Sequence, residues 1–370
     1  MNLMSGPAAL APMDTAGRLP RLRQRLAEAG CQALLVTRLA NLRYLTGFTG
    51  SAGLLLVLPD EDVLVTDGRY REQAAEELAR AGVELHLEIH ATVAGQRDAS
   101  ATAAAGIGRL GLEAGDVTWA AQRRYAEEWF ATSELVATEG VIEGLRERKD
   151  GGEVARLAEA ARVADAALAA VRPLLGEGPA ERDFGLALDG EMRRLGADDV
   201  SFETIVGSGP NGAKPHARPT GRTVAEGDLV VLDFGALVDG YHSDMTRTVM
   251  VGDPSPTQRR MLEVVAESQA AGVASVAAGT TCAEVDRACR DVIVAAGWGA
   301  HFVHGTGHGV GLDIHEDPRV SWASDATLAP GHVVTVEPGV YLPGHGGVRI
   351  EDTVVVTESG CRTLTRAPKT

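Results

Sequence analysis

The chain has 370 residues, a formal net charge of −16 and 45% apolar residues. This length predicts two or three domains with a large core, and the acidic balance argues against nucleic acid and anionic membranes as partners. No apolar run approaches the roughly 20 residues that span a bilayer. Residues 1–18 are expected to form a flexible extension that does not resemble a signal peptide.

The cysteines form no CxxC pair and no regular framework, and they are Cys31, Cys282, Cys289 and Cys361. Such spacing is typical of thiols in a reducing compartment and not of a disulfide scaffold. We therefore expect a cytoplasmic protein without disulfides or a membrane partner.

The first half of the chain alternates between helical and strand patterns. The spacing predicts helices over residues 19–30 and 69–81, and strands over 32–36, 53–58, 62–66 and 83–89. The charged run RERKDGGE at 146–153 marks a boundary between domains. This pattern predicts an α/β domain over residues 19–148.

The second half, residues 149–370, begins with two helices and then changes to strands and glycine-rich loops. Helices are expected over 152–172, 180–195, 256–277 and 282–296, and strands over 229–235, 245–251 and 352–357. The order of two helices, strands, two helices and strands hints at an internal duplication.

The segment DFGALVDGYHSDMT brings two carboxylates onto one hairpin. Asp239-Gly240 is a favoured two-residue turn, which would place Asp233 opposite Thr246 and leave Asp244 within about 8 Å on the same face. Two such carboxylates repel each other unless a cation lies between them or one stays protonated. The alternative is that both are solvated or cap turns.

The segment HFVHGTGHGVGLDIHE contains four histidines among closely spaced glycines. The glycines oppose a helix and allow a ligand to approach the backbone closely. An extended backbone would put His304 and His308 on one side. A lone histidine here could equally be a satisfied core or surface residue.

Two further carboxylates lie at the ends of strongly apolar strands. Glu337 follows VVTV and Glu351 precedes TVVV. An ionised glutamate in such surroundings is rarely left unpaired, although either alone could lie at a solvated strand end. Four carboxylates and one imidazole suit Mn²⁺, Co²⁺, Fe²⁺ or Zn²⁺, and two divalent ions would balance the charge.

These residues resemble the motifs of the creatinase and methionine aminopeptidase superfamily, the pita-bread peptidases. The matching segments are DFG…HSDMTRT, HGTGHGVGLDIHE, VEPGVY and RIEDTVVVT. The resemblance implies an α+β catalytic domain with a curved, mainly antiparallel sheet, after the α/β N-terminal domain. It also implies that Asp233 binds one metal, that His308 and Glu337 bind the second, and that Asp244 and Glu351 bridge both.

The same resemblance assigns further roles around the metals. Glu337 would carry a proton from the attacking water to the leaving amine, and His315 would stabilise the oxyanion. His216 would line the active site. The residues that shape the pocket in proline-specific members correspond to His304, Tyr341 and Arg349.

The N-terminal motifs NLRYLTGFTGSAG and TDGRYREQA resemble those of aminopeptidase P and prolidase. The resemblance thus implies a metallopeptidase that cleaves an N-terminal residue from proline, works on a peptide or dipeptide, holds two metal ions with Mn²⁺ preferred, and forms a homodimer. The choice between dipeptidase and aminopeptidase stays open. The alternatives are a metal-free creatinase-like hydrolase and a non-catalytic binding protein on the same fold.

Overall fold

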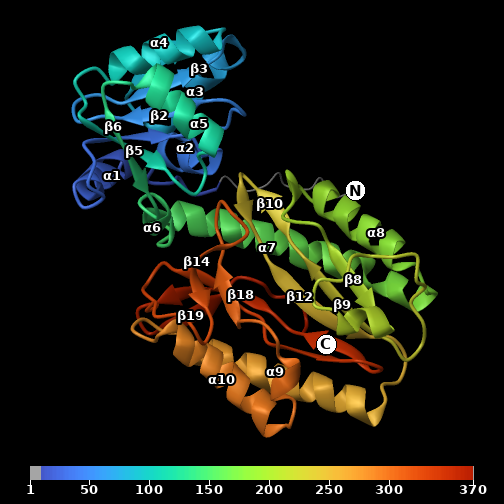
Figure 1. Ribbon diagram of the computed structural model, residues 1–370. Helices are drawn as coiled ribbons and strands as arrows, with labels where there is room; N and C mark the ends of the chain where they lie inside the picture. The colour runs from blue at the N-terminus through green and yellow to red at the C-terminus, as the bar shows by residue number, and fades with distance from the viewer. Residues whose placement is uncertain (1–9, 370) are drawn as a thin grey trace. The chain divides into compact units, whose positions relative to one another are not determined.

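The computed structural model describes residues 10–369. They divide into two compact units, residues 13–146 and residues 147–369 together with 10–12 (Figure 1). Residues 1–9 of the predicted extension lie outside the described residues. Within residues 10–369, none of the helices is long and apolar enough to cross a membrane.

The unit of residues 13–146 is built on a six-stranded mixed sheet with the order β4-β3-β2-β1-β5-β6. Its strands are β1 (Ala33–Val36), β2 (Leu54–Val57), β3 (Val63–Thr66), β4 (His86–Ile89), β5 (Arg109–Glu113) and β6 (Glu134–Thr138). Its α-helices are α1 (Arg18–Leu26), α2 (Leu39–Thr46), α3 (Arg71–Ala81), α4 (Val93–Ala103), α5 (Trp119–Arg124) and α6 (Glu143–Arg146).

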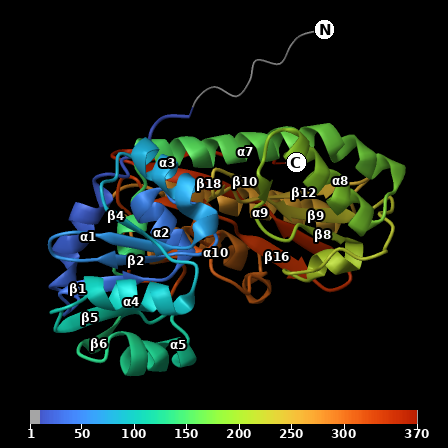
Figure 2. The ribbon, with the colours of Figure 1, turned by 90° about the horizontal axis from the view of Figure 1, so that it is seen from above.

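Strands β1 and β3 of this sheet are apolar except for Thr66, which fits a sheet covered on both faces. Every residue of β1 and β3 is buried. Helices α2 and α3 lie on one face of the sheet and α4 and α5 on the other (Figure 2). Continuous apolar runs of this kind are typical of strands in an α/β layer structure.

The larger unit begins with helices α7 (Gly151–Val171) and α8 (Glu181–Arg194), and later carries α9 (Pro256–Ser275) and α10 (Cys282–Ala295). Its first strands are β7 (Asp199–Val200), β8 (Ile205–Ser208), β9 (Leu229–Phe234), β10 (Ala236–Val238), β11 (Tyr241–His242) and β12 (Met245–Met250). The later strands are β13 (Gly307–Gly309), β14 (Glu316–Val320), β15 (Val333–Val336), β16 (Gly339–Leu342), β17 (Gly346–Arg349), β18 (Asp352–Thr357) and β19 (Gly360–Thr363).

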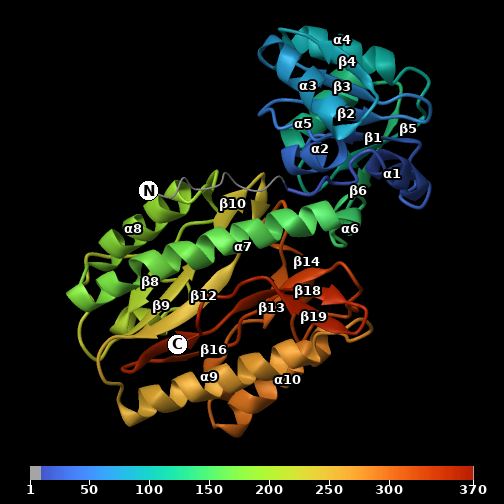
Figure 3. The ribbon, with the colours of Figure 1, turned by 180° about the vertical axis from the view of Figure 1, so that it is seen from behind.

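All strand pairs given for this unit are antiparallel, in sheets ordered β11-β10-β7, β12-β9-β8, β14-β13-β15-β18-β19 and β16-β17. The α7–α8 pair lies on one side of the strands and the α9–α10 pair on the other (Figures 1 and 3). Each pair buries its own apolar cluster against strands. The predicted fold class, an α/β unit followed by a mainly antiparallel α+β unit, is confirmed.

The hairpin that carries the two aspartates has the predicted register. Val238 pairs with Tyr241, and Thr246 pairs with Asp233. Asp239 and Gly240 both have positive φ, 47° and 75°, as a tight two-residue hairpin turn requires. A short-range turn signal therefore places both aspartates on one face.

We predict opposite effects for two glycine-to-alanine substitutions within helices. A Cβ at buried Gly272 of α9 would lie 2.2 Å from Cys289 Sγ and 2.8 Å from Val336 Cγ1. The Gly272→Ala variant should lower the free energy of unfolding by about 1–3 kcal/mol through overpacking. Exposed Gly190 of α8 has nothing within 4 Å, so Gly190→Ala should raise it by about 0.5–1 kcal/mol. Denaturant titration followed by circular dichroism measures both, and equal stability of Gly272→Ala and wild type would contradict the close packing of α9.

Candidate metal centre

The five residues expected to bind metal line a single pocket of about 380 Å³ within the larger unit. They come from distant segments that meet where strands end: Asp233 on β9, Asp244 just before β12, His308 on β13, Glu337 just after β15 and Glu351 just before β18. Side chains at strand ends can point into a cleft while the backbone of the same strands keeps its hydrogen bonds to the neighbouring strands. The structure therefore brings all five residues together.

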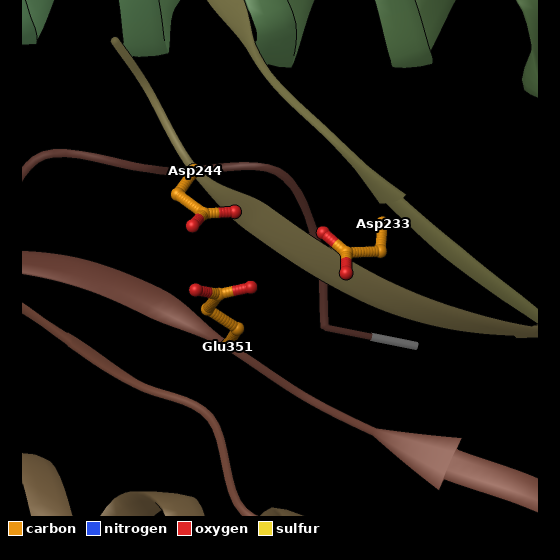
Figure 4. A group of neighbouring side chains, drawn as sticks. All are labelled: Asp233, Asp244 and Glu351. Carbon is orange, nitrogen blue, oxygen red and sulfur yellow. The ribbon is translucent and has the colours of Figure 1, made fainter. Parts of the chain in front are cut away.

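Three of the carboxylates form the centre of this group. Asp233, Asp244 and Glu351 each offer an oxygen, and these oxygens all lie within 4.8 Å of one another. Figure 4 shows the three side chains pointing toward a common point. Asp233 Oδ1 and Glu351 Oε1 are buried without a hydrogen-bond partner among the described residues. Buried acceptors are seldom left unsatisfied, so these oxygens fit a cation that the protein itself does not supply.

His308 presents a lone pair to the same point. Its Nδ1 donates to the carbonyl of Gly309 at 2.9 Å, which leaves Nε2 as the free acceptor. Nε2 lies 3.4 Å from Asp244 Oδ2 and 3.4 Å from Glu337 Oε1. Burial lowers the pKa of His308 to about 3, so the ring is neutral. Two atoms 3.4 Å apart can both bind one ion at about 2.1 Å, so His308 fits as the nitrogen ligand.

Burial and mutual repulsion make the ionised carboxylates unfavourable without a cation. Burial, and then the charges of Glu351, Asp233 and Glu337, raise the pKa of Asp244 well above its usual value. Burial, and then Glu337 and Asp233, do the same for the pKa of Glu351. Burial raises the pKa of Glu337 to about 7. An oxygen-rich donor set with one imidazole and this much suppressed charge fits divalent metal ions.

Arg349 lines the same pocket and is hydrogen-bonded to the metal ligands. This side chain is 4% exposed, and its Nη2 donates to Asp233 Oδ2 at 2.6 Å. Its Nε donates to Thr246 Oγ1 at 3.0 Å, and that hydroxyl donates to Glu351 Oε2 at 2.8 Å. Arg349 thus holds one oxygen of Asp233 and, through Thr246, one of Glu351, which turns the unpartnered oxygens toward the centre. These contacts give Arg349 a positioning role, and the substrate contact expected from the sequence stays a prediction.

The other two residues of the expected substrate pocket are joined to Arg349. Its Nη1 donates to Tyr341 Oη at 2.7 Å, and Tyr341 Oη lies 2.9 Å from His304 Nε2. Because His304 Nδ1 donates to the carbonyl of Gly305, the tyrosine hydroxyl donates to Nε2. His304 lines the pocket, whereas Tyr341 is buried behind it.

The rim of the pocket carries two exposed histidines from the expected set. His216 and His315 both line it, and the ring centroid of His315 is 4.4 Å from that of His308. Partial burial of the ring lowers the pKa of His315. The apolar part of the lining comes from Phe202, Ile205 and Ile314.

Arg319 lines the same pocket and was missed by the sequence analysis. Its side chain is exposed, and it forms no hydrogen bond or ion pair within residues 10–369. His315 and Arg319 are four residues apart, and burial alternates with a period of two from His315 into β14. That alternation places both side chains on one face, and it is visible in the structure but not in the sequence.

We predict that the Asp244→Asn variant is more stable than wild type when both are metal-free, increasingly so as pH rises. A carboxyl whose pKa is raised by folding binds its proton more tightly when folded, so it destabilises the protein above its ordinary pKa of about 4. The stability difference should be smallest near pH 4 and grow toward pH 8. Comparing the two proteins cancels the opposite effect of histidines that do not contact Asp244, such as His332, whose pKa is lowered by burial so that stability rises with pH.

Thermal unfolding of both proteins in chelator from pH 4 to 8 gives this difference, and adding Mn²⁺ should reverse it by stabilising wild type more. A difference that is constant or shrinks with pH would contradict the raised pKa of Asp244.

Comparison with known proteins identifies both units of the chain. Residues 155–358 match the model of metallopeptidase family M24, and residues 18–148 match the creatinase/prolidase N-terminal domain. An uncharacterized peptidase of Bacillus subtilis is 43% identical over 95% of this chain and 98% of its own length.

Solved structures agree with the sequence matches. A Xaa-Pro dipeptidase of Bacillus anthracis superposes with a TM-score of 0.92 at 39% identity, over 96% of this chain and 99% of that one. An X-Pro aminopeptidase of Thermotoga maritima superposes with a TM-score of 0.86 at 32% identity, over 95% and 99%. With the family model covering the larger unit and its candidate ligands, this chain belongs to metallopeptidase family M24 and carries the creatinase/prolidase N-terminal domain of the pita-bread superfamily.

Proposed function

We propose that the chain is a dinuclear-metal Xaa-Pro peptidase, which hydrolyses the bond between an N-terminal residue and proline. The observation that carries this proposal is the convergence of four carboxylates and the neutral His308, with two buried oxygens left without a partner. Similar proteins named Xaa-Pro dipeptidase and X-Pro aminopeptidase support the substrate class. Cytoplasmic localisation and a homodimer stay predictions from the sequence.

In this proposal the five ligands divide as the family resemblance implies. Asp233 would hold one ion, His308 and Glu337 would hold the second, and Asp244 and Glu351 would be shared by both. When bound, a pair of divalent ions activates a water molecule and polarises the substrate carbonyl. Mn²⁺ is the proposed metal, and Co²⁺, Zn²⁺ and Fe²⁺ suit the same donors.

The side chains around the ligands position the substrate and move its proton. Glu337 takes the proton of the attacking water and delivers it to the proline nitrogen, while Thr335 Oγ1 donates to Glu337 Oε1 at 3.1 Å and orients it. His315 donates to the developing oxyanion, a contact worth about 3 kcal/mol for single donors of this kind. His216 contacts the substrate amide.

Proline suits a pocket of this composition. An Xaa-Pro bond has no N–H, so the site needs no acceptor for one. The apolar side chains Phe202, Ile205 and Ile314 offer a surface for the ring. The pocket volume of about 380 Å³ is at the small end of ligand sites, which suits a short peptide.

Arg319 favours a dipeptide over a longer chain. A dipeptide has a free carboxylate directly after proline, and a guanidinium pairs with a carboxylate through two parallel hydrogen bonds. Arg319 is the unpaired cation that the described residues offer at this pocket, because Arg349 is committed to Asp233 and Tyr341. We therefore propose Xaa-Pro dipeptide as the preferred substrate.

The proposal predicts that Asp244→Ala abolishes hydrolysis of Xaa-Pro dipeptides. Altering groups that merely orient ligands lowers metal affinity or activity about 10–100-fold, so removing a bridging ligand should lower kcat/KM by at least about 100-fold. Asp253→Ala, at an exposed position after β12, is the control. Dialysis of wild type against chelator should give the same loss, and Mn²⁺ should restore activity. Undiminished turnover by Asp244→Ala, or by the metal-free protein, would rule the proposal out.

A separate prediction concerns substrate length. Arg319→Ala should lower kcat/KM about tenfold for Gly-Pro, equivalent to about 1.4 kcal/mol, mainly through KM. It should leave hydrolysis of Gly-Pro amide unchanged, because that substrate lacks the carboxylate. Arg319→Lys should recover part of the loss. Steady-state kinetics on both substrates measures this. An equal loss of kcat/KM on the two substrates would show that Arg319 does not bind the substrate carboxylate.

A further inference from the structure

We propose that the C-terminal segment, residues 364–369, is a positioning element for the bridging carboxylates Asp244 and Glu351. It acts through two residues that hydrogen-bond the backbone of those ligands, Arg247 and Thr353. The inference rests on the proposed metal site and assigns a role to the last residues of the chain that the proposed reaction does not use.

The first connection is a buried ion pair behind the metal site. Arg247 Nη2 lies 2.9 Å from Asp352 Oδ1, and the two side chains are 1% and 3% exposed. The Arg247 guanidinium also donates to the backbone carbonyls of Thr246 and Glu351, and its Nε donates to that of Ala367 at 3.0 Å. A buried charge pair is tolerated only when its remaining donors are satisfied. Arg247 therefore ties the backbone of a bridging ligand to the C-terminal segment.

The second partner of that pair is held by the same segment. Asp352 Oδ1 accepts from Thr365 Oγ1 at 3.0 Å, and Asp352 Oδ2 lies 2.9 Å from Lys369 Nζ. Gln269 Nε2 of α9 donates to Asp352 Oδ2 at 2.9 Å. Asp352 directly follows Glu351 in the chain. Contacts that fix the Asp352 carboxylate therefore also restrict the movement of the Glu351 backbone.

The third connection reaches the other bridging ligand. Thr353 Oγ1 donates to the backbone carbonyl of Asp244 at 2.8 Å. Thr353 N donates to Thr365 Oγ1 at 3.2 Å, and Leu364 N donates to the carbonyl of Thr353 at 2.9 Å. The single hydroxyl of Thr365 thus accepts from Thr353 and donates to Asp352. It joins the supports of both bridging ligands.

The segment has its own anchor to the body of the unit. The Asp165 carboxylate on α7 accepts from the backbone N–H groups of Arg366, at 2.8 Å, and Ala367, at 2.7 Å. The Arg366 side chain is exposed and makes none of these contacts. Metal sites lose affinity when supporting contacts shift their ligands by fractions of an ångström. The segment is placed to prevent such shifts.

The test compares three single substitutions in this segment. Thr365→Val keeps the shape of the side chain but removes the hydroxyl, whereas Thr365→Ser keeps the hydroxyl. Arg366→Ala changes the same segment without touching the network. For each protein, competition with a chromogenic chelator gives the Mn²⁺ dissociation constant, and thermal unfolding in chelator gives the stability of the metal-free form.

Thr365→Val should raise the Mn²⁺ dissociation constant about 10–100-fold, while Thr365→Ser and Arg366→Ala should match wild type. A Thr365→Val protein that melts at a lower temperature but binds Mn²⁺ as tightly as wild type would overturn the inference and leave the proposed function standing. A wild-type protein that binds no Mn²⁺ would overturn both.

Discussion

Mutual repulsion among buried carboxylates is the interaction on which the rest of the catalytic unit depends. Burial and like charge raise the pKa values of Asp244, Glu337 and Glu351, so the ionised forms of these groups are destabilised in the absence of a cation. Apolar side chains of similar volume at these positions would make the metal-free protein more stable. The arrangement is explained if divalent ions balance the charge, and the unpartnered oxygens of Asp233 and Glu351 are where such ions fit.

Around the ligands lies a layer of residues that hydrogen-bond to them. Arg349 holds Asp233, Thr246 holds Glu351, and the Gly309 carbonyl sets the tautomer of His308. Behind these, Arg247 and Thr353 hold the backbone of the bridging ligands. The two helix pairs bury separate apolar clusters against the strands. Fold stability and the geometry of the site therefore depend on the same strand ends.

The sequence was most informative where short-range rules decide the structure. The Asp-Gly turn predicted the register that pairs Asp233 with Thr246, and apolar runs next to Glu337 and Glu351 predicted partly or fully buried carboxylates at strand ends. That His308 and Glu337 would join these residues rested on the resemblance to a family, because no local pattern encodes contacts between distant segments.

Other features could not be predicted because they depend on packing in three dimensions. Arg349 lines the pocket as expected, but its hydrogen bonds to Asp233, Thr246 and Tyr341 were not predicted. A single arginine in a strand carries no signal of which face it occupies once both faces are buried. Arg319 was overlooked although it alternates with His315, since a charged residue on an exposed strand usually means only solvent contact.

The central claim is that a pair of cations compensates these carboxylates, and the most direct measurement is anomalous diffraction from crystals grown with Mn²⁺. The account predicts two anomalous peaks about 3.5–4 Å apart, with Asp244 and Glu351 between them and His308 bound to one. A pocket without anomalous density at saturating Mn²⁺, or a single ion bound elsewhere on the chain, would contradict it.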